Sequence, residues 1–238
     1  MPDVPPPGPA EFDAYAVGGY QGGMDDPLKR RFGRDLDQFL LPKVRWLLAD
    51  GSNTAARRML DFGCGNGQFL RLLRAEGYAG ELTGADVSAG MLAEAQVQWR
   101  GDRPPAWTAF APGEALPFAD GSFDDAVACC VFHHIPPAAR AFAAGELRRL
   151  VKPGGRLAVF EHNPFHPMTQ LVVCRASIDR DAILLSARSC RRLLHAAGFG
   201  TTRTRHLLVA PPNLPGAASL DRRLARLPLG TQYVVEAW

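Results

Sequence analysis

The sequence contains no apolar stretch that approaches the roughly 20 residues of a membrane-spanning helix. Its first residues lack a basic region followed by an apolar one, so we expect no secretory signal, no membrane partner and a cytoplasmic location. Arginine and lysine are spread along the chain rather than gathered in a run interleaved with aromatics. This distribution disfavours a nucleic-acid partner.

Cysteine is sparse, and none of the five cysteines falls in a CxxC pair. An odd number without such pairs argues against a disulfide framework and a zinc ribbon, so we expect reduced thiols. Charged residues are also few, at 21% against 47% hydrophobic residues. This balance excludes an intrinsically disordered chain and provides for a large core, which 238 residues can form as one domain.

The first residues of the chain differ in composition from the rest. Residues 1–11 are rich in proline and are expected to be a disordered lead-in. Residues 12–238 are expected to form a single domain, as a monomer or homodimer. This domain is predicted to start with a helical lid over residues 12–50, because apolar residues recur there at helical spacing after a glycine-rich approach.

Beyond residue 50, short apolar runs alternate with helical patterns, which is typical of a parallel sheet covered by helices on both faces. Residues 162–185 have weak periodicity and are predicted to be an irregular insertion on the substrate side. The expected strands are 58–62, 81–87, 107–110, 124–131, 156–161, 202–210 and 232–238, and the expected helices are 68–76, 89–100, 137–150 and 186–197.

A glycine-rich loop follows the first expected strand, in the segment LDFGCGNG at residues 60–67. Glycines at the point where a strand becomes a helix permit a sharp turn and a close approach of the backbone to a ligand. The dinucleotide fingerprint has its third glycine three residues after the second, whereas Gly63, Gly65 and Gly67 follow the spacing GxGxG. This spacing disfavours NAD, although a glycine loop alone is often an ordinary turn.

Two carboxylates accompany the loop. Asp61 lies just before it, where a carboxylate would offer charge-assisted hydrogen bonds to a cofactor with a positive amino group, such as S-adenosylmethionine. Asp86 ends the second expected strand, where an acidic side chain can accept hydrogen bonds from both ribose hydroxyls. The loop and Asp86 together favour a cofactor site over an ordinary turn.

Four segments between about residues 58 and 161 resemble the methyltransferase type 11 family of class I S-adenosylmethionine-dependent enzymes: LDFGCGNG, ADVSAGML, EALPFADGSFDDAVACCVFHHI and LVKPGGRLAVFE. The resemblance implies an α/β, Rossmann-like class I methyltransferase fold, with a mostly parallel seven-stranded sheet and helices on both faces. It also implies S-adenosylmethionine as the cofactor and transfer of its methyl group by in-line displacement. We expect a small-molecule acceptor, methylated on oxygen or nitrogen rather than on carbon or sulfur.

The chain departs from the family before the fourth strand. The family often has GDAEALPF there, with the aspartate accepting a hydrogen bond from the adenine amino group, whereas Pro112 at the matching position has neither a carboxylate nor a backbone N–H. Adenine is then expected to depend on other groups nearby. The complete set of expected cofactor contacts is Asp61, Gly63, Cys64, Gly65, Gly67, Asp86, Val87, Met91, Gly113, Glu114 and Cys129.

The acceptor is expected beyond the carboxyl ends of the fourth and fifth strands, where ligands of open α/β sheets bind. His134 and His162 are the expected catalytic residues, as groups that take or steer the proton of the acceptor, and a structural role for each stays open. No metal site is expected, because two prolines break the helix that would bring His162 and His166 together. Further expected substrate contacts are Tyr15, Tyr20, His133, Glu161, Asn163 and His166.

Three other functions stay open at this point. A relative that binds the cofactor without catalysis, as a partner subunit, is compatible with the missing adenine aspartate. An NAD(P)-dependent oxidoreductase would use a related sheet but is opposed by the glycine spacing. The cluster of Arg222, Arg223 and Arg226 favours a nucleic-acid or protein substrate, and a solvated helix face explains it as well.

Overall fold

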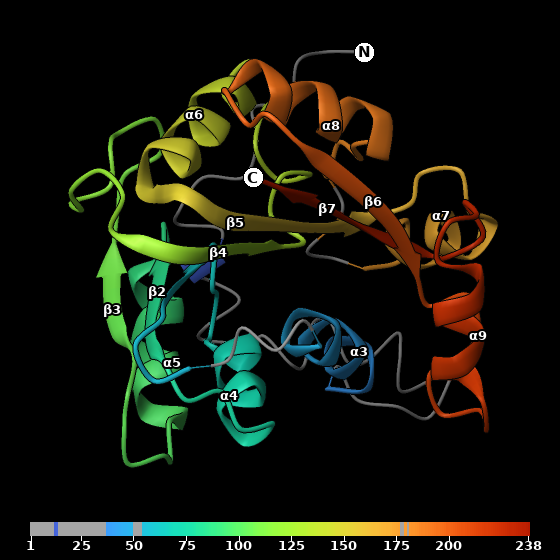
Figure 1. Cartoon of the computed structure of the whole chain (residues 1–238), viewed down its shortest axis with the longest axis horizontal. Helices are drawn as coiled ribbons and strands as arrows, with labels where there is room; N and C mark the ends of the chain where they lie inside the picture. Colours follow the sequence, from blue (N-terminus) through green and yellow to red (C-terminus); the bar gives the residue numbers. More distant parts are fainter. Residues whose placement is uncertain (1–11, 14–36, 50–53, 177–178, 180) are drawn as a thin grey trace.

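The structure is a computed structural model that describes residues 12–13, 37–49, 54–176, 179 and 181–238 (Figure 1). Within these residues seven strands form one sheet. The strands are β1 (Arg58–Phe62), β2 (Glu81–Asp86), β3 (Ala106–Ala109), β4 (Phe123–Cys129), β5 (Val151–His162), β6 (Thr202–Leu207) and β7 (Gln232–Ala237). The helices include α3 (Asp37–Leu48), α4 (Gln68–Ala75), α5 (Ala89–Gln98), α6 (Arg140–Leu150), α7 (Pro167–Val173), α8 (Ala187–Ala196) and α9 (Ala217–Leu224).

The strand order is β3-β2-β1-β4-β5-β7-β6, and the first five strands in this order run parallel. Strand β7 runs antiparallel to both of its neighbours, β5 and β6. Parallel neighbours need crossover connections, which α4, α5 and α6 provide. The expected Rossmann-like α/β fold, with a mostly parallel seven-stranded sheet, is therefore confirmed.

Helices cover both faces of the sheet (Figure 1). Helices α6 and α8 lie on one face, and α3, α4 and α5 lie on the other. Successive residues of a strand point to opposite faces, so Leu60 and Val159 belong to one apolar core while Met59 and Phe160 belong to the other. Burial on both faces explains why the central strands read as short, almost continuous apolar runs.

Several elements differ from the sequence-based prediction: helix α9 was not expected, and the largest differences near the site concern β5 and α7. Strand β5 is longer than expected and begins at Val151, directly after α6. The expectation of an irregular segment over 162–185 is wrong in part, because α7 lies within it. Pro167 takes the first helical position and the His166 ring accepts the Met168 N–H at 3.2 Å. A helix of only seven residues shows too few turns for periodicity to reveal it.

The lead-in at 1–11 and most of the expected lid lie outside the described residues. The described part of the lid comprises residues 12–13 and 37–49, and its helix α3 buries Leu40, Val44 and Leu47 against the sheet and α4. No helix in the described part of the chain is long and apolar enough to cross a membrane.

Candidate functional site

A cavity of about 280 Å³ lies at the carboxyl ends of β1, β4 and β5. Its wall combines the loop after β1, the end of β4, the turn that follows and the end of β5. Side chains of α3, α4 and α7, Asp179, the segment 208–212 and the start of β7 also line it. This is the edge at which open α/β sheets bind their ligands, as the sequence led us to expect.

The loop after β1 requires glycine at specific positions. Gly63 has φ +72°, and a Cβ built there would lie 2.6 Å from the nearest methyl carbon of Val131. Gly67 has φ +73°, and a Cβ there would lie 2.6 Å from the ring of Trp107. At Gly65, with φ +52°, a Cβ would meet nothing within 4 Å, so this glycine leaves room beside the cavity that it lines.

Asp61 brings a buried carboxylate to the wall of this cavity. The residue is 1% exposed, and its Oδ2 atom has no hydrogen-bond partner among the described residues. Burial, together with the neighbouring carboxylate of Asp86, raises the pKa of Asp61 to about 8. A buried carboxylate without a partner is costly, so this position is suited to a cationic group of a ligand.

Asp86 holds the loop to the start of α5. Its Oδ2 accepts the Gly65 N–H at 2.7 Å, and its Oδ1 accepts the Ser88 N–H at 2.9 Å. Burial raises the pKa of Asp86, and these backbone hydrogen bonds oppose the rise. Asp86 does not line the cavity, so in this structure its contacts order the backbone around the site.

The residues expected at the adenine end of the cofactor are not part of the cavity wall either. Val87 and Met91 lie at the start of α5, and Met91 is buried. Gly113 and Glu114 are exposed on the loop before β4. The structure therefore brings together the expected contacts of the methionine end, namely Asp61, Gly63, Cys64, Gly65 and Cys129.

Two described residues of the N-terminal segment reach this edge of the sheet. The ring of Phe12 lies edge-on to that of His134, with centroids 5.6 Å apart. The Asp13 carboxylate accepts hydrogen bonds from the Ser88 hydroxyl and from the Gly90 N–H. Residues 12 and 13 thus connect the turn after β4 with the start of α5, on either side of the glycine loop.

A buried lysine lies against two neighbouring thiols. The Nζ atom of Lys43, on α3, is 3.4 Å from Cys129 Sγ and 3.5 Å from Cys130 Sγ. Burial lowers the pKa of Lys43, but the two sulfur atoms outweigh it and raise that pKa. A hydrogen bond from the Cys130 thiol and the lysine charge lower the pKa of Cys129. The Lys43 ammonium thus donates to two adjacent sulfur atoms on the cavity wall, and Cys129 is the one of the two thiols whose pKa is lowered.

His133 and Glu161 form a fully buried pair behind the turn after β4. The His133 ring nitrogen Nδ1 is 2.6 Å from Glu161 Oε2, and the His133 backbone N–H donates to Oε1 at 3.3 Å. Burial lowers the pKa of His133, but the carboxylates of Glu161 and Asp179 outweigh it and raise that pKa well above its ordinary value. Burial raises the pKa of Glu161, and His133 brings it down to about 2.

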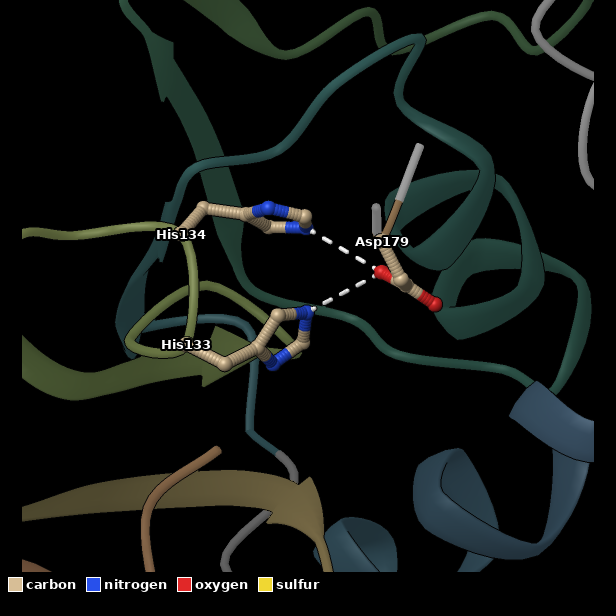
Figure 2. Close-up of side chains that lie close together, drawn as sticks. All are labelled: His133, His134 and Asp179. Carbon is tan, nitrogen blue, oxygen red and sulfur yellow. Dashed lines mark ion pairs between the residues drawn. The ribbon is translucent and has the colours of Figure 1, made fainter. Parts of the chain in front are cut away.

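Asp179 joins the same histidines from a distant part of the chain. Its Oδ1 atom is 3.4 Å from His133 Nε2 and 3.5 Å from His134 Nε2 (Figure 2). Burial and the charge on His133 lower the pKa of His134 to about 3. The same two causes lower the pKa of His162 to about 4, and its ring nitrogen Nδ1 is 3.3 Å from Gln232 Nε2. Both expected catalytic histidines line the cavity as neutral imidazoles.

The remaining expected substrate contacts are placed differently. Asn163 is buried, does not line the cavity, and donates its side-chain amide to the Gly230 carbonyl at 2.8 Å. Its role in the structure is to hold the turn after β5 against the start of β7. His166 lines the cavity and caps α7. Tyr15 and Tyr20 lie outside the described residues.

Sequence reasoning missed several polar side chains of the cavity wall, among them Lys43, Asp179 and Gln232. Lys43 had a visible signal, because it shares a helix face with Leu40, Val44 and Leu47, where an apolar residue is expected. Asp179 had none, because the segment around it shows no periodicity. Gln232 lies at the start of β7 and reaches the site through an antiparallel pairing that the local sequence does not specify.

Comparison with known proteins gives a consistent result. Residues 60–159 match the family described as a methyltransferase domain. The chain is 34% identical to the demethylmenaquinone methyltransferase of Beutenbergia cavernae over 157 residues, which cover 63% of this chain and 61% of that protein. It is 31% identical to the O-methyltransferase cnsE of Penicillium expansum over 189 residues, which cover 77% and 66%. The chain thus spans less than two thirds of the length of these curated relatives.

The fold is similar to that of a solved S-adenosylmethionine-dependent methyltransferase from Thermotoga maritima, described as a possible histamine N-methyltransferase. The TM-score is 0.66, and the match covers 95% of this chain and 97% of that one. The sequences are 19% identical, so this likeness concerns the fold alone.

Proposed function

Because the chain belongs to the class I S-adenosylmethionine-dependent methyltransferases and S-adenosylmethionine is its cofactor, we propose that it transfers a methyl group to a small-molecule acceptor. The observation that carries this proposal is the carboxylate of Asp61. It is buried, one of its oxygens has no hydrogen-bond partner in the part of the chain that the structure describes, and it lies on a cavity wall next to the glycine loop. A cationic cofactor satisfies such a group, whereas a dinucleotide pyrophosphate would be repelled by it.

The cofactor supplies an activated methyl group on a sulfonium centre. In our proposal Asp61 accepts hydrogen bonds from its amino group, and Gly63 and Gly65 give the backbone room to approach it. Cys64 and Cys129 contact the methionine part, since both line the cavity beside the loop. Asp86 keeps the loop in place through its hydrogen bond from Gly65, and its remaining lone pairs accept from the ribose.

The acceptor occupies the other end of the cavity, next to the histidines. An in-line displacement needs the acceptor atom held close behind the methyl carbon in a site that excludes water. His134 and His162 steer the proton of the acceptor by hydrogen bonds, as neutral imidazoles on the cavity wall. This arrangement favours an acceptor oxygen or nitrogen, which carries a proton for a histidine to orient.

Titration calorimetry tests the cofactor part of the proposal. We expect the purified protein to bind S-adenosylmethionine with micromolar affinity and not to bind NADH. Asp61→Asn removes one charge-assisted hydrogen bond, so it should weaken binding about 10- to 100-fold. Asp102→Asn, which changes an exposed aspartate away from the cavity, should bind like the wild type.

An acceptor screen tests the reaction. Phenols, amines and demethylated quinols are incubated with isotopically labelled cofactor, and products are identified by mass spectrometry. Labelled O- or N-methyl products support the proposal, and labelled C-methyl products would overturn the assignment of the acceptor atom. Binding of the cofactor without turnover on the whole panel would instead favour a non-catalytic relative that acts as a partner subunit.

A further inference from the structure

Three side chains from two distant segments converge on one point in the cavity wall. His133 and His134 follow β4, and Asp179 comes from the stretch between α7 and α8. Figure 2 shows both ring nitrogens Nε2 directed at the same carboxylate oxygen of Asp179, at 3.4 and 3.5 Å. Among the described residues, this is the one group of three such side chains whose ligand atoms lie within 4.8 Å of one another.

These distances fit ligands of a common ion better than hydrogen bonds. Among the described residues, the buried Nε2 atom of His133 has no partner in hydrogen-bond geometry, and its 3.4 Å contact with Asp179 Oδ1 is an ion pair. Nitrogen and oxygen ligands lie about 2.0–2.2 Å from zinc, and a tetrahedral angle then separates two ligands by about 3.4 Å. Both measured separations match this tetrahedral edge.

Glu161 provides the outer contact that metal-binding histidines usually have. Its Oε2 is 2.6 Å from His133 Nδ1, on the opposite side of the ring from Nε2. The other carboxylate oxygen of Glu161 accepts the His133 backbone N–H, so Glu161 fixes both the backbone and the ring of His133. Such a carboxylate sets the tautomer and the orientation of a ligating imidazole.

Backbone hydrogen bonds hold Asp179 opposite the histidines. The Asp179 N–H donates to Ala176 at 3.1 Å, and its carbonyl accepts from Ala182 at 3.1 Å. The Ile183 N–H then donates to the His133 carbonyl at 2.9 Å. This last bond ties the segment that carries Asp179 directly to the turn that carries the histidines.

We propose that His133, His134 and Asp179 bind one divalent transition-metal ion of the zinc class. Two imidazoles and a carboxylate suit zinc, cobalt, iron or nickel, whereas magnesium prefers oxygen ligands. All three residues line the cavity, so a fourth coordination position faces it. Three protein ligands and one open position are typical of catalytic rather than structural zinc sites.

The site revises the expectation that the chain has no metal centre. That expectation considered His162 and His166, and neither belongs to the set proposed here. The inference rests on the geometry of the three ligands and not on the proposed methyl transfer. If both hold, the open position is available to an oxygen or nitrogen of the acceptor, and His134 serves as a ligand while His162 orients the acceptor.

The test uses protein without a histidine tag, stripped of metal with a chelator and titrated with CoCl₂, ZnCl₂ and MgCl₂. We expect one Co²⁺ or Zn²⁺ ion per chain with micromolar or tighter affinity, and no measurable Mg²⁺ binding. Tetrahedral Co²⁺ should give an intense visible absorption band. Asp179→Asn and His134→Gln should each weaken Co²⁺ binding at least about 10-fold, and Glu161→Gln by about 10- to 100-fold.

The matched control is His166→Gln, which changes another histidine of the same cavity and should leave Co²⁺ affinity unchanged. Circular dichroism and calorimetry with S-adenosylmethionine verify that each variant is folded. Failure of the wild type to bind Co²⁺ stoichiometrically would overturn the proposal. Equal weakening in His166→Gln and Asp179→Asn would also overturn it, and cofactor binding, measured separately, tests the methyltransferase proposal on its own.

Discussion

The two ends of the cavity are built in different ways. The proposed cofactor end consists mainly of one short segment, from Asp61 to Asn66, held by one carboxylate at the end of the neighbouring strand. The acceptor end is assembled from α3, the turn after β4, the end of β5, the stretch after α7 and the start of β7. The first depends on backbone conformation, and the second depends on buried side chains that meet across the fold.

This difference indicates which amino-acid substitutions each end of the cavity can tolerate. A loop with glycines at positive φ, and with the side chains of Val131 and Trp107 within 3 Å of a built Cβ, has little freedom to change. A set of side chains from separate elements can exchange members without disturbing the sheet. One framework can therefore keep its cofactor while its acceptor site diverges.

Gly63→Ala is expected to have the largest effect on cofactor affinity, because it alters the backbone of the proposed cofactor end. The left-handed backbone costs about 1–2 kcal/mol for a non-glycine residue. The new methyl would also lie 2.6 Å from Val131, so the loop must move. We expect a loss of S-adenosylmethionine affinity greater than about 100-fold, measured by calorimetry, at a binding cost above about 2.7 kcal/mol.

Gly154→Ala provides the control for that substitution. Gly154 has φ +77° and a Cβ there would meet nothing within 4 Å, so it carries the backbone strain without the collision. Urea unfolding should show a lower stability for Gly154→Ala, while its cofactor affinity should equal that of the wild type. Comparable cofactor binding by Gly63→Ala and the wild type would contradict the importance of the glycine loop.

The pH dependence of stability should report the carboxylate at the cofactor end. The pKa of Asp61 is raised to about 8 in the folded chain, whereas an unfolded chain has an ordinary value near 4. As pH rises from about 4 to 8, the unfolded state loses this proton first, so the free energy of unfolding falls. Above about pH 8 the contribution of Asp61 is constant.

Asp61→Asn isolates that effect, because the variant has no proton to lose at this position. Urea unfolding at several pH values, without cofactor, should give a shallower decline between pH 4 and 8 than for the wild type. The difference is expected to be on the order of a few kcal/mol. Parallel curves for the two proteins would show that Asp61 has an ordinary pKa.

Lys43→Met should have a moderate effect on the reactivity of a thiol at the proposed acceptor end. The lysine ammonium helps lower the pKa of Cys129, so its removal should slow alkylation of that thiol by iodoacetamide several-fold at pH 8. Stability should change little, because an apolar side chain of similar length replaces a buried charge. Mass spectrometry of the labelled peptide measures the rate, and exposed Cys174 serves as the internal control.

The smallest effect on stability and activity is expected from substitution of three exposed arginines. Arg222, Arg223 and Arg226 are exposed on and just after α9, outside the cavity wall. Replacing all three with serine should change the free energy of unfolding by less than about 0.5 kcal/mol for each residue. Turnover of a small-molecule acceptor should be unchanged. A large loss of activity would instead favour the hypothesis that the substrate is a nucleic acid or a protein.

The contrast between local segments and contacts across the fold also explains which features could be predicted from the sequence. The strand 58–62 was predicted with its observed limits, because apolar runs and flanking glycines are local signals. The short helix α7 was missed, because seven residues give too few turns for a periodic pattern. At the cofactor end, the loop and Asp61 were found from spacing. The expected adenine contacts do not join them on the cavity wall.

The sequence by itself determined the class of fold and the position of the glycine loop that lines the cavity, because both follow from periodicity and from glycine spacing within short segments. Only the tertiary structure decided which polar groups share the acceptor end. Lys43, His134 and Asp179 are far apart in the chain, and they meet because α3 packs on one sheet face and because Ile183 pairs with His133. Contacts of this kind depend on packing between elements, which leaves no local pattern in the residues themselves.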